Sequence, residues 1–297
     1  MDENEFLAGR FEEHRAHLRA VAYRMLGSLS EADDAVQEAW LRLSRSDTSD
    51  VANLGAWLTT VVGRVSLDML RSRASRREEP LDLRMPDPVV GPAEGARPAD
   101  PEQQALISDA VGLALLVVLE SLAPAERLAF VLHDMFGVPF EEIAPIVDRT
   151  PAAARQLASR ARRRVRGAAP VPETDRARQR EVVDAFLTAA NDGDFAALVS
   201  VLHPDVVLRA DQGALAGGLR ELHGAEKVAG SALMFRRTTA VDVRPALVNG
   251  TAGVVNLRDG RPVSVLSFTI VDGRVAEIDI LADADRLAGL DLAFLDS

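Results

Sequence analysis

One short segment of the sequence has an unusual density of arginine. "TPAAARQLASRARRRVRG" occupies residues 150–167, and between residues 149 and 166 there are seven arginines and no acid, although the net charge of the chain is −11. The seven are Arg149, Arg155, Arg160, Arg162, Arg163, Arg164 and Arg166. Arginine and glutamine side chains hydrogen-bond to the edges of DNA bases, and arginine also pairs with phosphates. A single basic face of this kind would allow an acidic protein to bind nucleic acid.

Helical geometry separates the side chains of this segment cleanly. Thr150, which is also a candidate DNA-binding residue, is suited to cap a helix, and Pro151 is suited to its first turn. At 100° per residue, one side carries small apolar residues: Ala154, Leu157, Ala158, Ala161 and Val165. The other side carries the candidate DNA-binding residues Arg155, Gln156, Ser159, Arg160, Arg162, Arg163 and Arg166. We expect the first four of these to read bases and the last three to contact phosphates.

A second, shorter helix is predicted directly before the basic one. In "PFEEIAPIVDRT", the apolar residues Phe140, Ile143, Ala144 and Val147 share one side, and only a few residues separate this helix from the next. Two helices joined by a tight turn, with base-reading side chains at the start of the second, form a helix-turn-helix. Asp148 occupies the turn position often held by glycine, and aspartate tolerates turn conformations. The alternative is a solvated basic helix, or one that faces an acidic partner; DNA binding is favoured.

The N-terminal region contains a candidate protein-binding stripe. In "SEADDAVQEAWLRL" (residues 30–43), the side opposite the apolar face carries Asp34, Gln37, Glu38 and Leu41. Acids, an amide and a solvent-side leucine on one line suit an interface with a basic partner. An ordinary exposed helix face with one stray leucine explains the pattern equally well.

A second basic cluster follows in "NLGAWLTTVVGRVSLDMLRSRASRREE", which ends in Arg71, Arg73, Arg76 and Arg77. Arginines in a last helical turn complement the helix dipole, which is the simpler explanation. Two such clusters in separate domains suggest a duplex held at two places.

The rest of the chain divides by composition into a linker and an α+β region. Residues 78–102 contain six prolines and seven acids against two arginines, which is typical of an extended linker. After a second break at residues 167–175, a helix is expected at about 176–190. Strand-like runs follow, and "RDGRP" and "VDGRV" are Asp-Gly hairpin signals.

We therefore predict a multidomain chain. Residues 1–77 form a helical domain, 78–102 an acidic proline-rich linker, and 103–167 a helical domain with the helix-turn-helix. A short linker at 168–175 then leads to an α+β domain at 176–297.

Composition narrows the classes of site and location. The chain has no cysteine, which excludes disulfides and thiolate metal sites, and its five histidines show no metal-ligand spacing. We therefore expect no metal and no cofactor. The acidic start is unlike a signal peptide, and the longest apolar run, Ala110 to Leu119, is too short to cross a bilayer. We expect a cytoplasmic protein that does not contact a membrane.

Three blocks of the helical part resemble a bacterial RNA polymerase sigma factor of the extracytoplasmic-function group. They are "LGSLSEADDAVQEAWLRL", "AWLTTVVGRVSLDMLRSRASRRE" and "LAPAERLAFVLHDMFGVPFEEIAPIVDRTPAAARQLASRARRRV", and the resemblance covers about residues 6–166. It implies that the first domain binds the −10 promoter element and the clamp of the polymerase core, through Asp34, Gln37, Glu38 and Leu41. The helix-turn-helix domain would read the −35 element beside the flap region. The linker would thread towards the polymerase active-site channel.

Residues 176–297 resemble a SnoaL-like domain, a cone-shaped curved sheet with helices over its mouth. "AANDGDFAALVSVLHPDVVLRAD", "HGAEKVA" and "VDGRVAEIDIL" carry this resemblance. The combination is similar to the sigma-factor subgroup whose C-terminal extension regulates it without a separate anti-sigma protein.

Three motifs of that subgroup are altered in this chain. A Trp-Leu-Pro-Glu-Pro linker motif aligns with residues 84–88, Asp-Gly-Gly-Gly-Lys with residues 211–215, and Asn-Pro-Asp-Lys-Leu with residues 283–287. The resemblance implies that these positions hold the extension on the sigma domains, so Asp87, Asp211, Gly213 and Asp285 are candidate regulatory contacts.

An enzyme is the alternative function, because the same fold hosts isomerases and cyclases that use a base in an apolar cone. The helical part would then be a DNA-targeting module. Candidate bases are His203, Asp205, Asp211, His223 and Asp279. A general base needs burial and reach to a substrate proton, and the sequence indicates neither. We therefore assign no catalytic residue; regulation, or sensing of an unidentified small ligand, is favoured.

Overall fold

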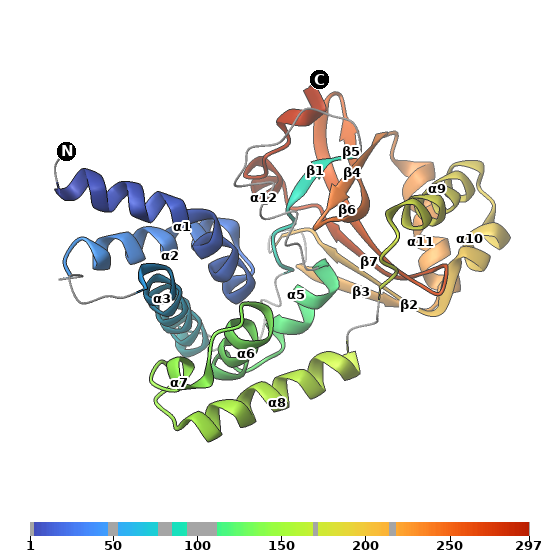
Figure 1. The fold of residues 1–297 in the computed structure, drawn as a ribbon. Coiled ribbons are helices and arrows are strands. Elements are labelled where there is room, and N and C mark those ends of the chain that lie inside the picture. The colour runs from blue at the N-terminus through green and yellow to red at the C-terminus, as the bar shows by residue number, and fades with distance from the viewer. Residues whose placement is uncertain are drawn as a thin grey trace. The chain divides into compact units, whose positions relative to one another are not determined.

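The computed structural model describes residues 3–46, 53–76, 85–93, 112–168, 172–213 and 218–296 (Figure 1). The chain divides into two compact units. The first comprises Met1–Pro80 with Leu116–Ala168, and the second comprises Leu81–Leu115 with Ala169–Ser297. The described part of the proline-rich segment, residues 85–93, therefore belongs to the same unit as the C-terminal α+β region.

The first unit is helical. Its elements are α1 (Glu3–Leu26), α2 (Leu29–Leu43), α3 (Leu54–Arg76), the Leu116–Glu120 part of α5 (Leu113–Glu120), α6 (Pro124–Phe130), a π-helical turn η1 (Val131–Met135), α7 (Phe140–Ile143) and α8 (Pro151–Ala168). Helices α1, α2 and α3 pack on one another, and α8 packs mainly on α6.

The two helical groups of this unit also contact each other, through α3 and α6. Arg127 is 3 % exposed and donates to the carbonyl oxygen of Met25 at 2.9 Å. Gly63 allows the close approach of the helices, because a Cβ there would lie 3.1 Å from Leu132 Cδ1. These contacts join the end of α1 and the middle of α3 to α6 and η1.

The second unit is an α+β domain built on a seven-stranded sheet. Its helices are α9 (Arg176–Asp192), α10 (Phe195–Val201), α11 (Ala225–Thr238), α12 (Ala284–Ala288) and a 3-10 turn η3 (Ala293–Asp296). Its strands are β1 (Val90–Pro92), β2 (Leu202–Asp211), β3 (Leu219–His223), β4 (Asp242–Val248), β5 (Thr251–Arg258), β6 (Arg261–Val271) and β7 (Arg274–Leu281). The strand order is β1-β4-β5-β6-β7-β2-β3, and only the β2–β7 pair is parallel.

Both predicted Asp-Gly hairpins are present. Asp259 and Asp272 have φ of 51° and 49°, and the glycine after each is also at positive φ. Two successive left-handed residues match the twist of the flanking strands. The turns therefore set the register of β5, β6 and β7. The predicted fold class, two helical parts followed by an α+β domain, is confirmed.

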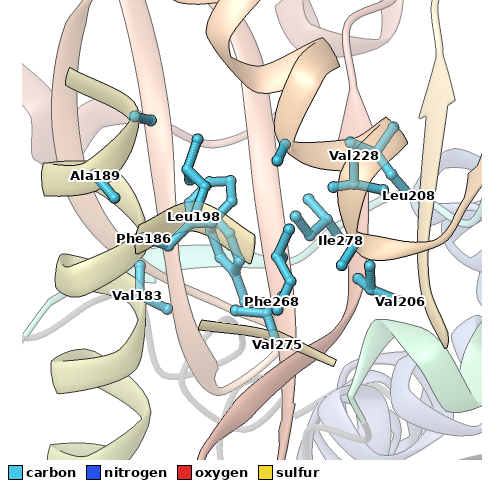
Figure 2. Packing of buried hydrophobic residues seen from close by; sticks show 14 of the residues in the cluster. Val183, Phe186, Ala189, Leu198, Val206, Leu208, Val228, Phe268, Val275 and Ile278 are labelled. Carbon is cyan, nitrogen blue, oxygen red and sulfur yellow. The ribbon is translucent and has the colours of Figure 1, made fainter. Parts of the chain in front are cut away.

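Helices α9, α10 and α11 cover one face of the curved sheet (Figure 1). Apolar side chains from the helices and from alternate strand positions fill the space between them (Figure 2). Phe186 of α9 meets Phe268 of β6 with their ring centroids 5.6 Å apart. Leu208 and Ile278 point into this core from β2 and β7.

The proline-rich segment adds an edge strand to this sheet. Val90, Gly91 and Pro92 pair antiparallel with Val248, Leu247 and Ala246. The segment from Met85 to Gly91 is buried. Its described part is therefore extended and contacts the C-terminal domain through β1, Asp87 and Val89.

Candidate nucleic-acid interface and linker contacts

The start of α8 has the geometry that a helix-turn-helix requires. Asp148 adopts φ of 54°, which lets the chain turn between α7 and α8. Thr150 Oγ1 accepts a hydrogen bond from the backbone N–H of Ala153 at 3.2 Å and so caps the helix. The predicted apolar side is buried, with Ala154, Ala158 and Ala161 fully enclosed.

The predicted DNA-binding side of α8 faces solvent. Arg155, Gln156, Ser159, Arg160, Arg163 and Arg166 are exposed, and Arg162 is half-buried. The Arg155 guanidinium lies 5.2 Å from the centroid of the Phe140 ring, which orients it at the N-terminal end of the helix. The side chains required for an interface with a duplex are therefore on one accessible face.

Acids from neighbouring helices reach the edges of this face. Arg160 Nε and Arg164 Nη1 each donate to Glu126, both at 2.8 Å, and Arg162 Nε donates to Asp134. Glu126 is 7 % exposed, whereas the arginine side chains on either side of it remain half exposed. These ion pairs hold the guanidinium groups in place without removing them from solvent.

The second basic cluster is only partly available to a nucleic acid. Arg71 is exposed, next to Asp68. Arg73 is turned towards the fold, because it pairs with Glu31 and donates to the carbonyl oxygen of Leu26 at 3.1 Å. Arg76 ends α3, and Arg77 lies outside the described residues.

The α2 stripe is accessible. Asp34 and Gln37 are exposed, Leu41 is 37 % exposed, and Glu38 is half-buried and pairs with Arg42 at 3.0 Å. The opposite side of α2 packs into the core through Ala35, Val36 and Ala39.

A single arginine joins the linker to the end of the sheet. Arg286, near the start of α12, donates to Asp87 through Nη2 at 2.6 Å, to the carbonyl oxygen of Met85 at 2.6 Å, and to Asp211 through Nη1 at 2.7 Å. Asp211 also binds the linker directly, because its carboxylate accepts a hydrogen bond from the backbone N–H of Met85 at 3.2 Å. We call the cluster of Met85, Asp87, Asp211 and Arg286 the linker clamp.

The clamp is buried and charge-assisted. The side chains of Arg286 and Asp211 are each 7 % exposed, and that of Asp87 is 12 % exposed. Hydrogen bonds between ionised groups at these distances are about twice as strong as neutral ones. A further contact lies beyond it, where the amide of Asn249 accepts from the N–H of Val89 at 3.0 Å.

Two of the four candidate regulatory residues therefore belong to the clamp, Asp87 and Asp211. Gly213 lies beside it at φ of 81°, where a Cβ would lie 2.5 Å from Asp283 Oδ2. Asp285 is exposed, and its backbone N–H donates to the helix cap Asp283.

Sequence reasoning did not single out Arg286. Arg286 stands at the lysine position of the terminal motif. Its positive charge, in a chain whose other two aligned motifs carry Asp87 and Asp211, was the sequence feature that could have indicated an ion pair. Arg84, Ala214 and Leu215 of the aligned motifs lie outside the described residues.

The candidate bases do not lie in the apolar core of the C-terminal domain. Ile278 points into that core, so its neighbour Asp279 is on the opposite face of β7, where Arg209 binds it at 3.1 Å. His203 and Asp205 form a local turn through a backbone bond, and His223 is exposed beside Glu221. None of these groups has the position of a base inside the cone.

Asp279 is nevertheless an unusual carboxyl. Burial raises its pKa to about 6, while Arg209 opposes the rise and Glu277 adds to it. Burial lowers the pKa of Arg209, but Asp279 and Glu277 offset this and raise it overall. One arginine thus faces three carboxylates, the third being Glu221 at 3.3 Å.

Comparison with known proteins identifies the two helical parts. Residues 10–76 match the family model for Sigma-70 region 2, and residues 112–165 match that for Sigma-70, region 4. Over 292 residues the chain is 39% identical to the ECF RNA polymerase sigma factor SigJ of Mycobacterium tuberculosis, which covers 94% of this chain and 92% of that protein. The chain is an ECF RNA polymerase sigma factor.

The likeness extends over the whole sigma factor, including its C-terminal domain. The crystal structure of M. tuberculosis SigJ matches with a TM-score of 0.75 and 37% sequence identity, over 96% of this chain and 99% of that one. A probable ECF sigma factor SigI of the same organism is 33% identical and covers 97% of each chain. The chain is thus a sigma factor with a C-terminal SnoaL-like domain.

Membership in this family implies that the protein binds the RNA polymerase core and promoter DNA. The enzyme alternative is not favoured, since its matched relatives are sigma factors. Within the described ranges, no helix has the length and apolar character needed to cross a membrane. In the same ranges no three or more His, Asp or Glu side chains are grouped as metal ligands.

Proposed function

We propose that this sigma factor recognises its promoters through α8 and the arginines of α3, and that its C-terminal domain regulates it by retaining the linker. The linker clamp is the observation that carries the regulatory part. Asp87 of the linker lies more than a hundred residues before Asp211 of β2 and Arg286 of α12, which are 75 residues apart, and the three meet in one buried cluster.

The promoter part rests on the exposed face of α8. We assign Arg155, Gln156, Ser159 and Arg160 to base edges, because they lie within its first ten residues, towards the end at which a recognition helix enters the major groove. Arg162, Arg163 and Arg166 lie further along and are assigned to phosphates, together with Arg71 and Arg76. Thr150 positions the helix through its cap.

The polymerase part rests on α2. Asp34, Gln37, Glu38 and Leu41 form an accessible stripe on a helix whose opposite face is fixed in the core. We assign the stripe to the clamp of the core enzyme, as the family resemblance implies, and the region-4 domain to the flap.

Regulation by the C-terminal domain follows because a docked linker cannot run towards the active-site channel of the polymerase. In sigma factors of this group, the resemblance implies a linker that runs towards the active-site channel of the polymerase. Residues buried in the clamp and in β1 are not available for that path. Releasing the linker therefore costs the clamp hydrogen bonds and the β1–β4 pairing, which makes the C-terminal domain an inhibitor in cis.

Transcription from reconstituted holoenzyme tests this function. Full-length protein is compared with a chain that ends after Asp175, on promoters selected by the holoenzyme itself. Both are expected to initiate at the same promoters, and the shortened chain is expected to initiate more often. Identical transcription by the two proteins across these promoters would show that regulation in cis is wrong.

A further inference from the structure

Exposed large apolar side chains are rare on this protein and are concentrated at one place. Four are exposed in the part of the chain that the structure describes: Leu41, Phe195, Met234 and Phe235. The last three lie on α10 and α11 of the C-terminal domain, and Met234 is 68 % exposed. Met234 and Phe235 lie near the end of α11, and Phe195 begins α10 directly after the turn that follows α9.

A hollow of about 750 Å³ lies beside them. It is lined by residues of α9, of the turn after α9 and of α11, with no strand residue among them, so it is separate from the space between the helices and the sheet. Ala190 and Leu233 form part of its apolar lining, and Met234 stands at its rim. We call the hollow, with Phe195, Met234 and Phe235, the α9–α11 groove.

Gly230 lines this hollow without a side chain. It lies in the interior of α11, where glycine costs about 1 kcal/mol relative to alanine. Its φ is not positive, and a Cβ at this position would meet nothing within 4 Å. Neither backbone conformation nor crowding therefore requires a glycine here, and its effect is to enlarge the hollow.

The groove also has a basic side. Arg236 and Arg237 line it, against one acid, Asp192. Arg236 donates to the side-chain oxygen of Asn191. Arg237 is exposed and forms no ion pair with the described residues. An occupant should therefore present an apolar side chain flanked by carboxylates. A small ligand would be enclosed on most sides, whereas this groove opens outward over exposed apolar side chains, which favours a protein surface.

Leu41, the fourth exposed apolar residue, lies on a surface where carboxylates flank an apolar side chain. Leu41 is the end of the α2 stripe, and Asp34 and Glu38 precede it by seven and three residues, on the same side of the helix. Asp34 is exposed and pairs with no cation in the described ranges. The stripe thus complements the groove in both apolar character and charge.

We propose that the α9–α11 groove binds the α2 stripe of a second copy of this chain, with Leu41 in the hollow and the stripe carboxylates facing Arg237. The contact is small, so the association is weak and reversible. It covers the stripe that the proposed function assigns to the polymerase core, and this consequence rests on that function. Self-association itself does not depend on it.

Sedimentation equilibrium of the full-length protein tests the association. The average mass of the wild-type protein is expected to rise above that of the monomer as its concentration increases, and to rise less at high salt. Replacements Arg237→Glu and Gly230→Leu should each weaken association at least about tenfold, by reversing the charge and by filling the hollow. Lys227→Glu, which makes the same charge change at the other end of α11, should leave it unchanged.

A charge swap identifies the partner surface. Asp34→Arg alone should weaken association at least about tenfold, as Arg237→Glu alone should. An equimolar mixture of the two variants should associate again, because the unaltered groove of Asp34→Arg then faces the unaltered stripe of Arg237→Glu, and the reversed groove faces the reversed stripe. A monomeric mass for the wild type at every concentration, or a mixture that fails to associate, overturns the proposal.

The masking consequence is measured separately, with the polymerase core. If self-association competes for the stripe, the core should bind Arg237→Glu about twofold more tightly at a protein concentration equal to the self-association constant. Equal core binding would reject masking. If the wild-type protein did not bind the core at all, the proposed function would be rejected, but the conclusion about self-association from sedimentation would be unaffected.

Discussion

Within the linker clamp, Arg286 makes more hydrogen bonds to the docked linker than Asp211 does. It satisfies one oxygen of Asp87, the carbonyl of Met85 and one oxygen of Asp211. Because all three charged groups are largely buried, neither carboxylate can be rehydrated while the linker stays docked. The stability of docking therefore depends on this one cation.

Replacing Arg286 with alanine should release the linker. The change removes the cation that faces the buried carboxylates of Asp87 and Asp211, and removing one partner of a buried ion pair typically costs about 3–5 kcal/mol. Deuterium uptake by the amides of Val89 and Val90 is expected to rise to that of an open segment, while uptake by β6 and β7 stays low. Unchanged protection of the linker amides would contradict the role of Arg286.

Asp279 predicts a pH dependence of stability. Its pKa is raised in the folded protein, from an ordinary value near 4 to about 6. The folded state therefore binds a proton more readily than the unfolded state, and stability is lost as pH rises from about 4 to 6 and does not return above that. Asp279→Asn should stabilise the protein at pH 7, on the order of 2 kcal/mol, and should have little effect near pH 4.

Chemical denaturation at several pH values measures this difference. Glu221→Gln is the matched control, since it makes the same charge change on a carboxylate that is 46 % exposed. If the two replacements show the same pH dependence, burial of Asp279 is not the cause.

At the scale of elements, β1 and α8 make separable predictions. Asn249 holds β1 at its start, because its side chain accepts from the N–H of Val89 and its backbone N–H donates to the carbonyl of Val89. It has φ of 49°, so glycine fits its turn. Asn249→Gly should cost about 1 kcal/mol of linker docking and leave the β4–β5 hairpin intact, which amide exchange of the two strands distinguishes. Equal exposure of both strands would mean that the hairpin itself had been lost.

The two halves of α8 should differ in their effect on DNA binding. Arg155→Ala is expected to cost about 1–3 kcal/mol on the preferred −35 sequence and to relax sequence preference. Arg166→Ala should weaken binding to all sequences equally and reduce the salt dependence by about one charge. Binding isotherms of the holoenzyme on matched and scrambled duplexes give both quantities. If Arg155→Ala weakened binding to matched and scrambled duplexes equally, Arg155 would contact phosphate and not a base.

Sequence patterns predicted the elements in which local preference and tertiary structure agree. Helix α8 has a cap, a proline at its first turn and a continuous apolar stripe, and strands β5, β6 and β7 alternate between Asp-Gly turns. Strand β4 was missed because Pro245 interrupts it. The structure accommodates this proline because β1 pairs only with Ala246–Val248, so residue 245 has no neighbour on that side among the described strands.

Strand β1 and the linker clamp could not be predicted from the local sequence pattern, for a different reason. Val90 and Gly91 lie in a proline-rich, acidic segment that has no strand pattern of its own, and their partners lie about 156 to 158 residues later in the chain. The clamp likewise depends on pairing between three distant motifs. Family resemblance indicated Asp87 and Asp211 and placed Arg286 at a lysine position, but that this arginine bonds to both acids follows only from their positions in space.

At the scale of the whole molecule, the chain combines promoter recognition with a domain that retains the segment joining its two sigma regions. The affinity of that retention sets how often the linker is free to enter the polymerase. Each 1.4 kcal/mol removed from docking raises the free fraction about tenfold while docking dominates. Small changes at the clamp should therefore have large effects on initiation.

The most direct measurement compares transcription by holoenzymes that carry either the wild-type sigma factor or Arg286→Ala, at equal and saturating occupancy of the core. A linker held by the clamp predicts a several-fold rise in initiation at the same start sites for the variant. Equal or lower initiation, with the linker amides of the variant shown to be exposed, would contradict inhibition by the C-terminal domain.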